Sequence, residues 1–272
     1  MSNNSEILIQ DKSSNGVLRL VMNDLSSRNS LSENMMSSLL DSLDNASKDK
    51  DIKVVIIASN GDVFCSGHNL KEINNARNND DEGNAYYQKL FNKCSILMQA
   101  IVNCPKPIIA EIDGVATAAG CQLVASCDLA IASNESRFAT PGVNIGLFCS
   151  TPMVALSRNV SNKNAMKMLL TGEMISATEA TNIGLINNNV KKDLVKKEVL
   201  DLASNIASKS MITVSTGKKA FYAQSEMTLS DAYSYTSDVM KNNALRSDAR
   251  EGISAFLEKR NPNWNQSEDL DS

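Results

Sequence analysis

The chain has 272 residues, of which 42% are hydrophobic and 21% are charged, and its net charge is −4 at pH 7. A chain of this size can bury a core of its own, and its acidic balance offers no basic field for nucleic acid. No apolar run approaches the roughly 18 residues that span a membrane, and the first residues lack the basic start and apolar stretch of a signal peptide. We therefore expect a cytoplasmic protein without a nucleic-acid or membrane partner.

Cysteine and histidine usage argues against a metal site. The six cysteines form no CxxC pair, and there is a single histidine, so no common set of zinc ligands is present. The residues around the cysteines are largely apolar, which indicates reduced thiols in a cytoplasm.

Strand and helix patterns alternate through the first two thirds of the chain. Residues 6–10 and 17–22 read as paired strands, residues 54–58 as a buried strand, and residues 108–112 and 129–132 as further strands. Helical spacing of apolar residues predicts helices over 32–46 and 86–102, the second with Phe91, Cys94, Ile96, Leu97 and Ile101 facing inward, and a polar surface loop at 74–84. This alternation predicts an α/β core.

The last part of the chain is predicted to be all helical. Helices are expected over 193–208, 213–224, 228–245 and 248–259, and capping boxes are expected at Ser176–Glu179 and Thr228–Asp231. We therefore expect an α/β core over residues 1–190 and a helical region over 191–272. Residues 261–272 are polar and are expected to fray.

One segment suggests a chemical site. The apolar run 107–112 reaches Gly114, then a cluster of very small residues, and then a helix-like stretch that contains Ala119 and Gln122. Small residues let a ligand approach the backbone, and the start of a helix offers free N–H groups to a developing negative charge. Gln122 cannot take or give a proton at ordinary pH. The segment therefore indicates an oxyanion site without the usual proton-transfer group.

Five segments, in order over residues 17–260, resemble the crotonase superfamily, also called the enoyl-CoA hydratase/isomerase family. They are V-F-C-S-G-H-N-L-K-E at 63–72, G-V-A-T-A-A-G-C-Q-L at 114–123, F-A-T-P-G-V-N-I-G at 138–146, the stretch 171–185, and E-G-I-S-A-F-L-E-K-R at 251–260. Within the family, A-T-A-A-G-C-Q-L is most similar to the hydratase-domain-containing proteins.

The resemblance implies a spiral core of repeated ββα units with a C-terminal helical trimerisation region. It also implies binding of an acyl-CoA thioester, with coenzyme A as part of the substrate and no separate cofactor. By position, the oxyanion donors are the backbone N–H groups of His68 and Ala119, in turns that also hold Ser66, Gly67 and Gly120. The family's two glutamates align with Gln122 and Gly142, which puts hydratase and isomerase chemistry in doubt.

The resemblance also assigns binding positions outside the two turns. CoA contacts are expected from Arg28 and Lys71, and from Phe256 and Lys259 in the C-terminal helix. Cys149 and Ser150 are expected to line the acyl pocket. The expected assembly is a homotrimer or a dimer of trimers.

Several residues keep two interpretations. The His68 side chain either points away from the site or acts as an acid/base. Cys149 either lines the pocket or is a nucleophile, which would need an activating base. Glu111 and Asp113 share a strand face and are expected to be solvated or to cap a helix, with Asp113 as a minor candidate for a base. Asp128 is expected to be a structural carboxylate bound to backbone amides.

Three functions remain open at this stage. The first is an enzyme that polarises a CoA thioester, with hydrolysis by a water held by Gln122 or weak hydratase or isomerase activity. The second is a non-catalytic acyl-CoA-binding or assembly subunit. The third is a thiol-dependent acyltransferase that uses Cys149.

Overall fold

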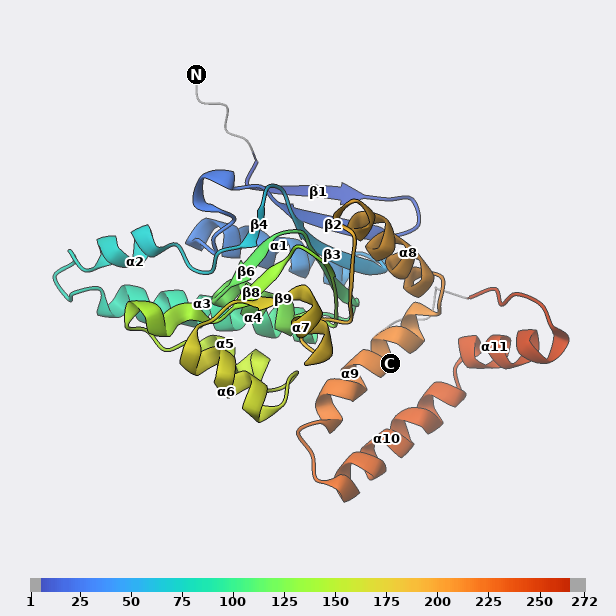
Figure 1. Ribbon diagram of the computed structural model, residues 1–272. Coiled ribbons are helices and arrows are strands. Elements are labelled where there is room, and N and C mark those ends of the chain that lie inside the picture. Colours follow the sequence, from blue (N-terminus) through green and yellow to red (C-terminus); the bar gives the residue numbers. More distant parts are fainter. Residues whose placement is uncertain (1–5, 265–272) are drawn as a thin grey trace.

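The computed structural model describes residues 6–264, which form an α/β body with three helices projecting from one side (Figure 1). The chain begins with an antiparallel hairpin, β1 (Leu8–Lys12) and β2 (Val17–Met22). This agrees with the predicted pair of strands, although β1 begins two residues later than expected.

Three consecutive pairs of strands build two sheets. The pairs are β3 (Val54–Ser59) with β4 (Val63–Cys65), β5 (Ile108–Ile112) with β6 (Val115–Thr117), and β7 (Leu129–Ser133) with β8 (Arg137–Ala139). The first strand of each pair joins the six-stranded sheet β1-β2-β3-β5-β7-β10, and the second joins the four-stranded sheet β4-β6-β8-β9. The remaining strands are β9 (Ile175–Ser176) and β10 (Asn188–Val190). This arrangement confirms the predicted α/β core of repeated ββα units.

Helices follow the strand pairs and cover the sheets. They are α1 (Glu33–Lys48), α2 (Leu70–Ala76), α3 (Asn84–Asn103), α4 (Ala119–Ser126), α5 (Ser150–Leu156), α6 (Asn162–Thr171) and α7 (Ala177–Asn182). Short 3₁₀ helices occupy Leu25–Ser27, Pro141–Ile145 and Lys192–Leu194. The segment predicted as a polar loop at 74–84 begins inside α2 instead. The capping box predicted at Ser176 is confirmed, with both reciprocal bonds formed to Glu179.

The inner strands of the large sheet, β2, β3, β5 and β7, are largely buried, and successive residues along them point to opposite faces of the sheet. Leu18, Leu20, Val55 and Ile57 belong to the main core, which also contains the inner faces of α1 and α3. Val17, Val21, Val54 and Ile56 pack instead with Val195, Val199 and Ala203 of α8 (Val195–Ala207). The sheet therefore supports α1 and α3 from one side and α8 from the other.

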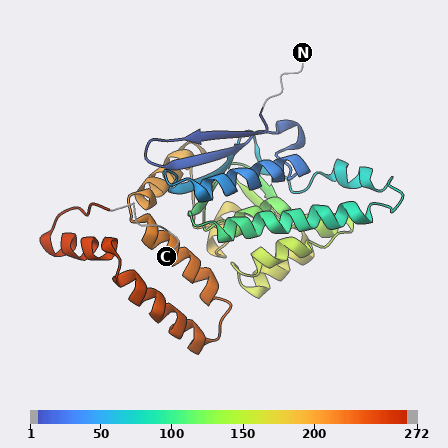
Figure 2. The same ribbon diagram turned by 180° about the vertical axis from the view of Figure 1, so that it is seen from behind.

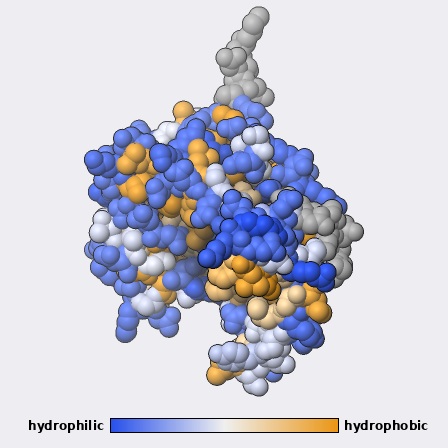
Figure 3. All heavy atoms as spheres, turned by 90° about the vertical axis from the view of Figure 1, so that its right-hand side faces the viewer, coloured by the Kyte–Doolittle hydropathy of each residue, from blue (hydrophilic) through white to orange (hydrophobic). Residues whose placement is uncertain are grey.

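The last three helices, α9 (Met211–Gln224), α10 (Leu229–Ala244) and α11 (Ser247–Glu258), project away from the body (Figures 1 and 2). At the start of α10, the Thr228 side chain accepts from the Asp231 N–H, which is one half of the predicted capping box, while Asp231 Oδ2 accepts from the Thr228 hydroxyl instead of its backbone N–H. Large apolar side chains stay exposed on α10 and α11, and apolar residues gather over this end of the molecule (Figure 3): Leu229, Tyr233, Met240, Leu245, Phe256 and Leu257. None of the helices within residues 6–264 is long and apolar enough to cross a membrane.

A buried ion pair joins α9 to the body. Lys218 Nζ donates to Asp128 Oδ2 at 2.7 Å, and also to the carbonyl oxygens of Ile101 and Lys106. Asp128 also accepts from the Ile108 N–H at 2.7 Å and from the Tyr222 hydroxyl at 2.9 Å. The predicted structural role of Asp128 is confirmed, and its partners show that this carboxylate connects α9 to the main sheet.

We predict that Lys218→Met lowers the free energy of unfolding by about 3 kcal/mol, because it leaves the Asp128 carboxylate buried without its cation. Urea unfolding followed by circular dichroism measures the change. The matched control is Lys197→Met, which removes an exposed pair with Asp201 on α8 and is expected to leave stability essentially unchanged. Equal effects of the two substitutions would contradict this role for Lys218.

Candidate functional site

Two turns meet at the carboxyl ends of neighbouring strands. β4 and β6 run parallel, with Val63 opposite Val115 and Cys65 opposite Ala116, so the residues that follow both strands emerge at the same edge. Thr117 Oγ1 donates to the Ser66 carbonyl at 3.0 Å across the two turns. The loop 66–68 and the start of α4 therefore form one structural unit.

The backbone N–H groups of His68 and Ala119 lie in this unit. An ideal Cβ placed on Gly67 would lie 3.3 Å from the Ala119 nitrogen, so the two turns are in contact. Ala119 is the first residue of α4 and is 1% exposed, so its N–H has no acceptor within the helix. Within residues 6–264, neither this N–H nor that of His68 donates to any acceptor. Two free donors at a buried turn can stabilise a developing oxyanion.

Backbone constraints hold the start of α4 in place. Ala118 precedes the helix at φ 50° and ψ −117°, a conformation that costs an alanine energy and that often occurs at functional sites. Gly120 lies directly against β4, because a Cβ at this position would be 2.2 Å from the Cys65 carbonyl oxygen. Any side chain at position 120 would therefore push α4 away from the loop that contains His68.

The His68 side chain turns inward, onto α3. Its ring meets the Phe91 ring edge-on with centroids 5.6 Å apart, and Nδ1 lies 3.4 Å from the Leu31 carbonyl oxygen. Nε2 is buried and has no hydrogen-bond partner among the described residues. Burial lowers the pKa of His68 below its ordinary value. The imidazole is therefore neutral at pH 7, and its ring packs against α3.

Gln122 occupies the inner side of the same site. Its residue is 4% exposed, and its Oε1 lies 3.8 Å from the Cys94 sulfur, which donates to it. Phe91 and Cys94 are three residues apart on α3 and therefore share one face of that helix. The contacts of His68 and of Gln122 thus lie one helical turn apart on α3. Sequence reasoning had placed both α3 residues inward but had not linked them to the site.

The loop that contains Gly142 closes tightly over itself. A Cβ at position 142 would lie 2.4 Å from the Leu147 carbonyl oxygen and 2.9 Å from the Cys149 sulfur. Burial raises the pKa of Cys149, whose sulfur accepts from the Gly142 N–H. The thiol therefore fills the space above Gly142 in its neutral form, and Ser150 follows it, exposed, at the start of α5. This position has no room for a glutamate side chain in place of Gly142.

The remaining predicted residues fall into two groups. Arg28 and Lys71 are exposed, next to the loops that carry Ser66 and His68. Phe256, which is 82% exposed, and Lys259 belong to α11 and its C-cap, and α11 lies at the opposite end of the molecule from α2 (Figure 1). The structure does not bring these two residues to the site of their own chain.

The other acidic candidates are engaged elsewhere. Glu111 forms a buried pair with Arg19 of β2, with Nη2 and Oε1 2.5 Å apart, so its expected solvation is wrong. Asp113 lies 3.5 Å from Lys192 Nζ, and burial raises its pKa. Neither carboxylate contacts the turns that hold His68 and Ala119.

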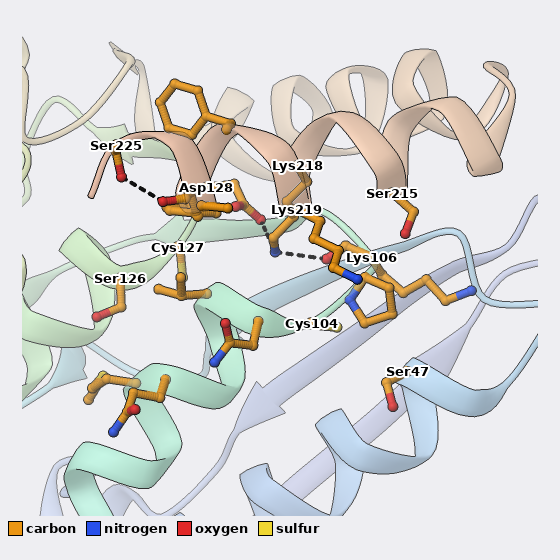
Figure 4. A pocket seen from close by; sticks show the side chains of 18 of the residues that line it. Ser47, Cys104, Lys106, Ser126, Cys127, Asp128, Ser215, Lys218, Lys219 and Ser225 are labelled. Atoms are coloured by element: carbon orange, nitrogen blue, oxygen red, sulfur yellow. Dashed lines mark hydrogen bonds and ion pairs between the residues drawn. The ribbon is translucent and has the colours of Figure 1, made fainter. Parts of the chain in front are cut away.

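A separate groove of about 1620 Å³ runs between α3, α4, α5 and α9. Figure 4 shows Ser126, Cys127 and Asp128 in its wall, with Lys218 and Lys219 contributed by α9. It shares Gln122 with the site but is lined by neither His68 nor Ala119. His68 and Ala119 therefore lie outside this groove.

The fold and these two turns define a class of protein, and the chain belongs to the enoyl-CoA hydratase/isomerase family, whose model matches residues 12–267. Human enoyl-CoA hydratase domain-containing protein 3 is 47% identical over 92% of this chain and 80% of its own length, and the Xenopus laevis protein of that name is 46% identical over 93% and 84%. The crystal structure of the human protein aligns with TM-score 0.90 and 46% identity over 95% of this chain and all of that one. An enoyl-CoA hydratase of Mycobacterium smegmatis aligns with TM-score 0.91 and 44% identity over 95% and 99%.

These relatives confirm the predicted family and the predicted similarity to its hydratase-domain-containing proteins. They contradict the predicted cytoplasmic location. The relatives from Xenopus, rat, mouse, human and zebrafish are all named mitochondrial proteins, which points to the mitochondrion rather than the cytoplasm. The expectation relied partly on reduced thiols. All six cysteines are indeed free and buried, but a buried thiol stays reduced through lack of access and does not identify a compartment.

We predict that Gly120→Ala strongly lowers the melting temperature, because the added methyl group would overlap the Cys65 carbonyl. The matched control is Gly217→Ala in α9, where a Cβ meets nothing within 4 Å. That control is expected to raise the free energy of unfolding by about 0.5–1 kcal/mol, since alanine favours a helix interior. A Gly120→Ala protein as stable as the wild type would show that α4 does not lie so close to β4.

Proposed function

We propose that this chain binds an acyl-CoA thioester and polarises its carbonyl with the backbone N–H groups of His68 and Ala119. The observation that carries the proposal is the pair of free donors at the junction of two buried turns. A thioester that becomes an enolate or a tetrahedral intermediate concentrates charge on one oxygen. Two fixed donors in a dry site are worth several kcal/mol to such a charge. An Escherichia coli relative, 31% identical over 91% of this chain and 94% of its own length, is named 2,3-dehydroadipyl-CoA hydratase.

Binding of the CoA portion is assigned to cations beside the two turns. Arg28 and Lys71 are exposed and adjoin the loops of Ser66 and His68, where they can meet phosphate groups. Coenzyme A arrives as part of the substrate, so no separate cofactor is required. Cys149 and Ser150 line the acyl side of the site in this proposal, with Gly142 beneath them.

The proposal includes a homotrimer or a dimer of trimers. Phe256 and Lys259 lie too far from the site of their own chain, so they contribute to CoA binding only from a second copy (Figure 1). The exposed apolar residues of α10 and α11 support association, because a soluble monomer rarely exposes so large a set of apolar side chains. This assembly matches the expectation drawn from the family resemblance.

The residues at the positions of the family's two glutamates, Gln122 and Gly142, limit the reactions that this site can catalyse. Gln122 can hold a water molecule but cannot take its proton, and Gly142 has neither a side chain nor room for one. Thioester hydrolysis, weak hydration and isomerisation remain compatible with an oxyanion hole alone. Acyl transfer through Cys149 is disfavoured, because burial raises the pKa of its thiol.

A second candidate is a non-catalytic acyl-CoA-binding or assembly subunit, favoured by the same absence of glutamates at 122 and 142. The two candidates share the binding site and differ only in turnover. Incubation with crotonyl-CoA, followed by loss of the double bond and by release of free thiol, separates them. Binding of crotonyl-CoA with neither loss of the double bond nor release of free thiol would favour the non-catalytic subunit.

We predict that butyryl-CoA binds more tightly than S-butyl-CoA, the thioether that lacks the carbonyl oxygen. Each of the two hydrogen bonds lost from the oxyanion site is expected to cost about 0.5–1 kcal/mol, and the two together give roughly a fivefold to thirtyfold difference in Kd. Isothermal titration calorimetry measures both ligands, with free CoA as the control for the nucleotide contribution. Equal Kd values for thioester and thioether would contradict the oxyanion site.

A further inference from the structure

The site has a proton-transfer requirement that its usual positions do not meet. Gln122 and Gly142 carry no acid or base, and the nearby thiols are poor candidates. Burial raises the pKa of Cys65, Cys94 and Cys121 to about 12 each, so all three stay protonated near neutral pH. A proton acceptor for this site must therefore come from another group.

His68 has the buried and unpartnered atom that such a role requires. Nδ1 faces the Leu31 carbonyl at 3.4 Å, which favours the tautomer that carries its proton on Nδ1. The lone pair of Nε2 is then free, and this atom is buried without a hydrogen-bond partner among residues 6–264. A buried acceptor without a hydrogen bond lowers the stability of the folded protein. The unpaired Nε2 of His68 therefore suggests a functional role for this atom.

The ring is also in the right place. Its own backbone N–H is one of the two proposed oxyanion donors, and its contact with Phe91 places it one helical turn from the contact between Gln122 and Cys94. The imidazole and the Gln122 amide therefore both pack on the inward side of α3, the helix that also contacts α4. The Phe91 ring restricts the imidazole, so its orientation is fixed by packing.

Charged neighbours do not compete for this role. The Glu72 carboxylate lies 3.4 Å from the Asn69 side-chain nitrogen, from the Tyr86 hydroxyl and from the Glu33 N–H, which holds it at the junction of α1 and α2. The elements around the ring carry titratable groups: Glu33, Asp41, Asp44 and Lys48 on α1, Cys65 on β4, Lys71 and Glu72 on α2, Tyr86, Tyr87, Lys89, Lys93 and Cys94 on α3, and Cys121 on α4. None of them shifts the pKa of His68, which responds only to burial and to the Leu31 carbonyl.

From this arrangement we infer that His68 Nε2 is the proton carrier of the site, exchanging a proton with the α-carbon of the bound thioester. The inference rests on the proposed binding of an acyl-CoA. Nε2 takes the α-proton, the C–H electron pair forms the C=C bond of the enolate, and the carbonyl π pair moves to the oxygen held by the two N–H groups. The imidazolium exchanges its Nε2 proton with water. Return of a proton from Nε2 to the α-carbon, as the oxygen electron pair re-forms the C=O bond, then restores the thioester, so no oxidant or reactant other than water is needed.

The test is exchange of the α-protons of butyryl-CoA in D₂O, followed by ¹H NMR with the full-length protein. We expect exchange by the wild type, and a loss of at least about a hundredfold in His68→Gln, as is typical when a general base is removed. His68→Phe keeps the aromatic packing and removes the orphaned nitrogen. It is expected to fold at least as well as the wild type and to be equally inactive in exchange.

The pH dependence separates a proton carrier from a merely structural residue. Because only the neutral imidazole can take a proton, exchange is expected to rise with pH through an inflection below 6.5, the ordinary pKa of histidine, and then to level off. This inflection should be absent in His68→Gln and His68→Phe. Glu72→Gln is the matched control and is expected to leave the exchange rate and its pH profile unchanged.

Calorimetry with butyryl-CoA on the same samples distinguishes two kinds of failure. Wild-type binding without exchange at any pH would overturn the role of His68 and leave the proposed acyl-CoA binding standing. Exchange that survives in both His68 variants, or that is lost in Glu72→Gln, would also overturn it. Absence of butyryl-CoA binding by the wild type would overturn both proposals.

Discussion

The close approach of α4 to β4 is the constraint on which the rest of the site depends. Gly120 lies so near the Cys65 carbonyl that no Cβ fits between them. This contact aligns the first turn of α4 with the loop that follows β4, and so it brings the start of the helix, with Ala119, close to the loop that holds His68. Parallel pairing of β4 with β6 sets the same relation from the sheet, and the strained backbone at Ala118 completes the turn. Catalysis by fixed donors requires this rigidity, because flexible donors would have to reorganise as charge develops.

The α3 helix provides the second surface of the site. Its buried face contacts the His68 ring through Phe91 and the Gln122 amide through Cys94. These groups are neutral, and burial keeps the thiols and the imidazole uncharged near pH 7. In the proposed site, such neutral and buried surroundings would strengthen the effect of two N–H donors on a developing oxyanion, because the local dielectric is low. The buried pair of Lys218 and Asp128 lies apart from these groups, where it attaches α9 to the body.

Much of the fold could be predicted from the sequence, because periodicity and small-residue turns report local structure directly. The buried strand at 54–58, the helix that became α3 and the small-residue turn before α4 are examples. The sequence could not predict the distances between residues that lie far apart along the chain. The clash that leaves no room at Gly142 depends on the path of residues 147–149, and the remoteness of Phe256 depends on where α11 lies. The pairing of Glu111 with Arg19 likewise joins strands that are far apart in the sequence. The contact of His68 with α3 was missed for the same reason, although Phe91 had been predicted to face inward.

The most direct test of the account is the vibrational state of the bound thioester carbonyl. Isotope-edited infrared spectroscopy with [1-¹³C]butyryl-CoA isolates this one C=O stretch from the protein amide bands. Two hydrogen bonds from His68 and Ala119 weaken the C=O bond, so the account predicts that the band moves to lower frequency when the ligand binds. A carbonyl band at or above the frequency of the free ligand in water, with binding established by calorimetry, would contradict it.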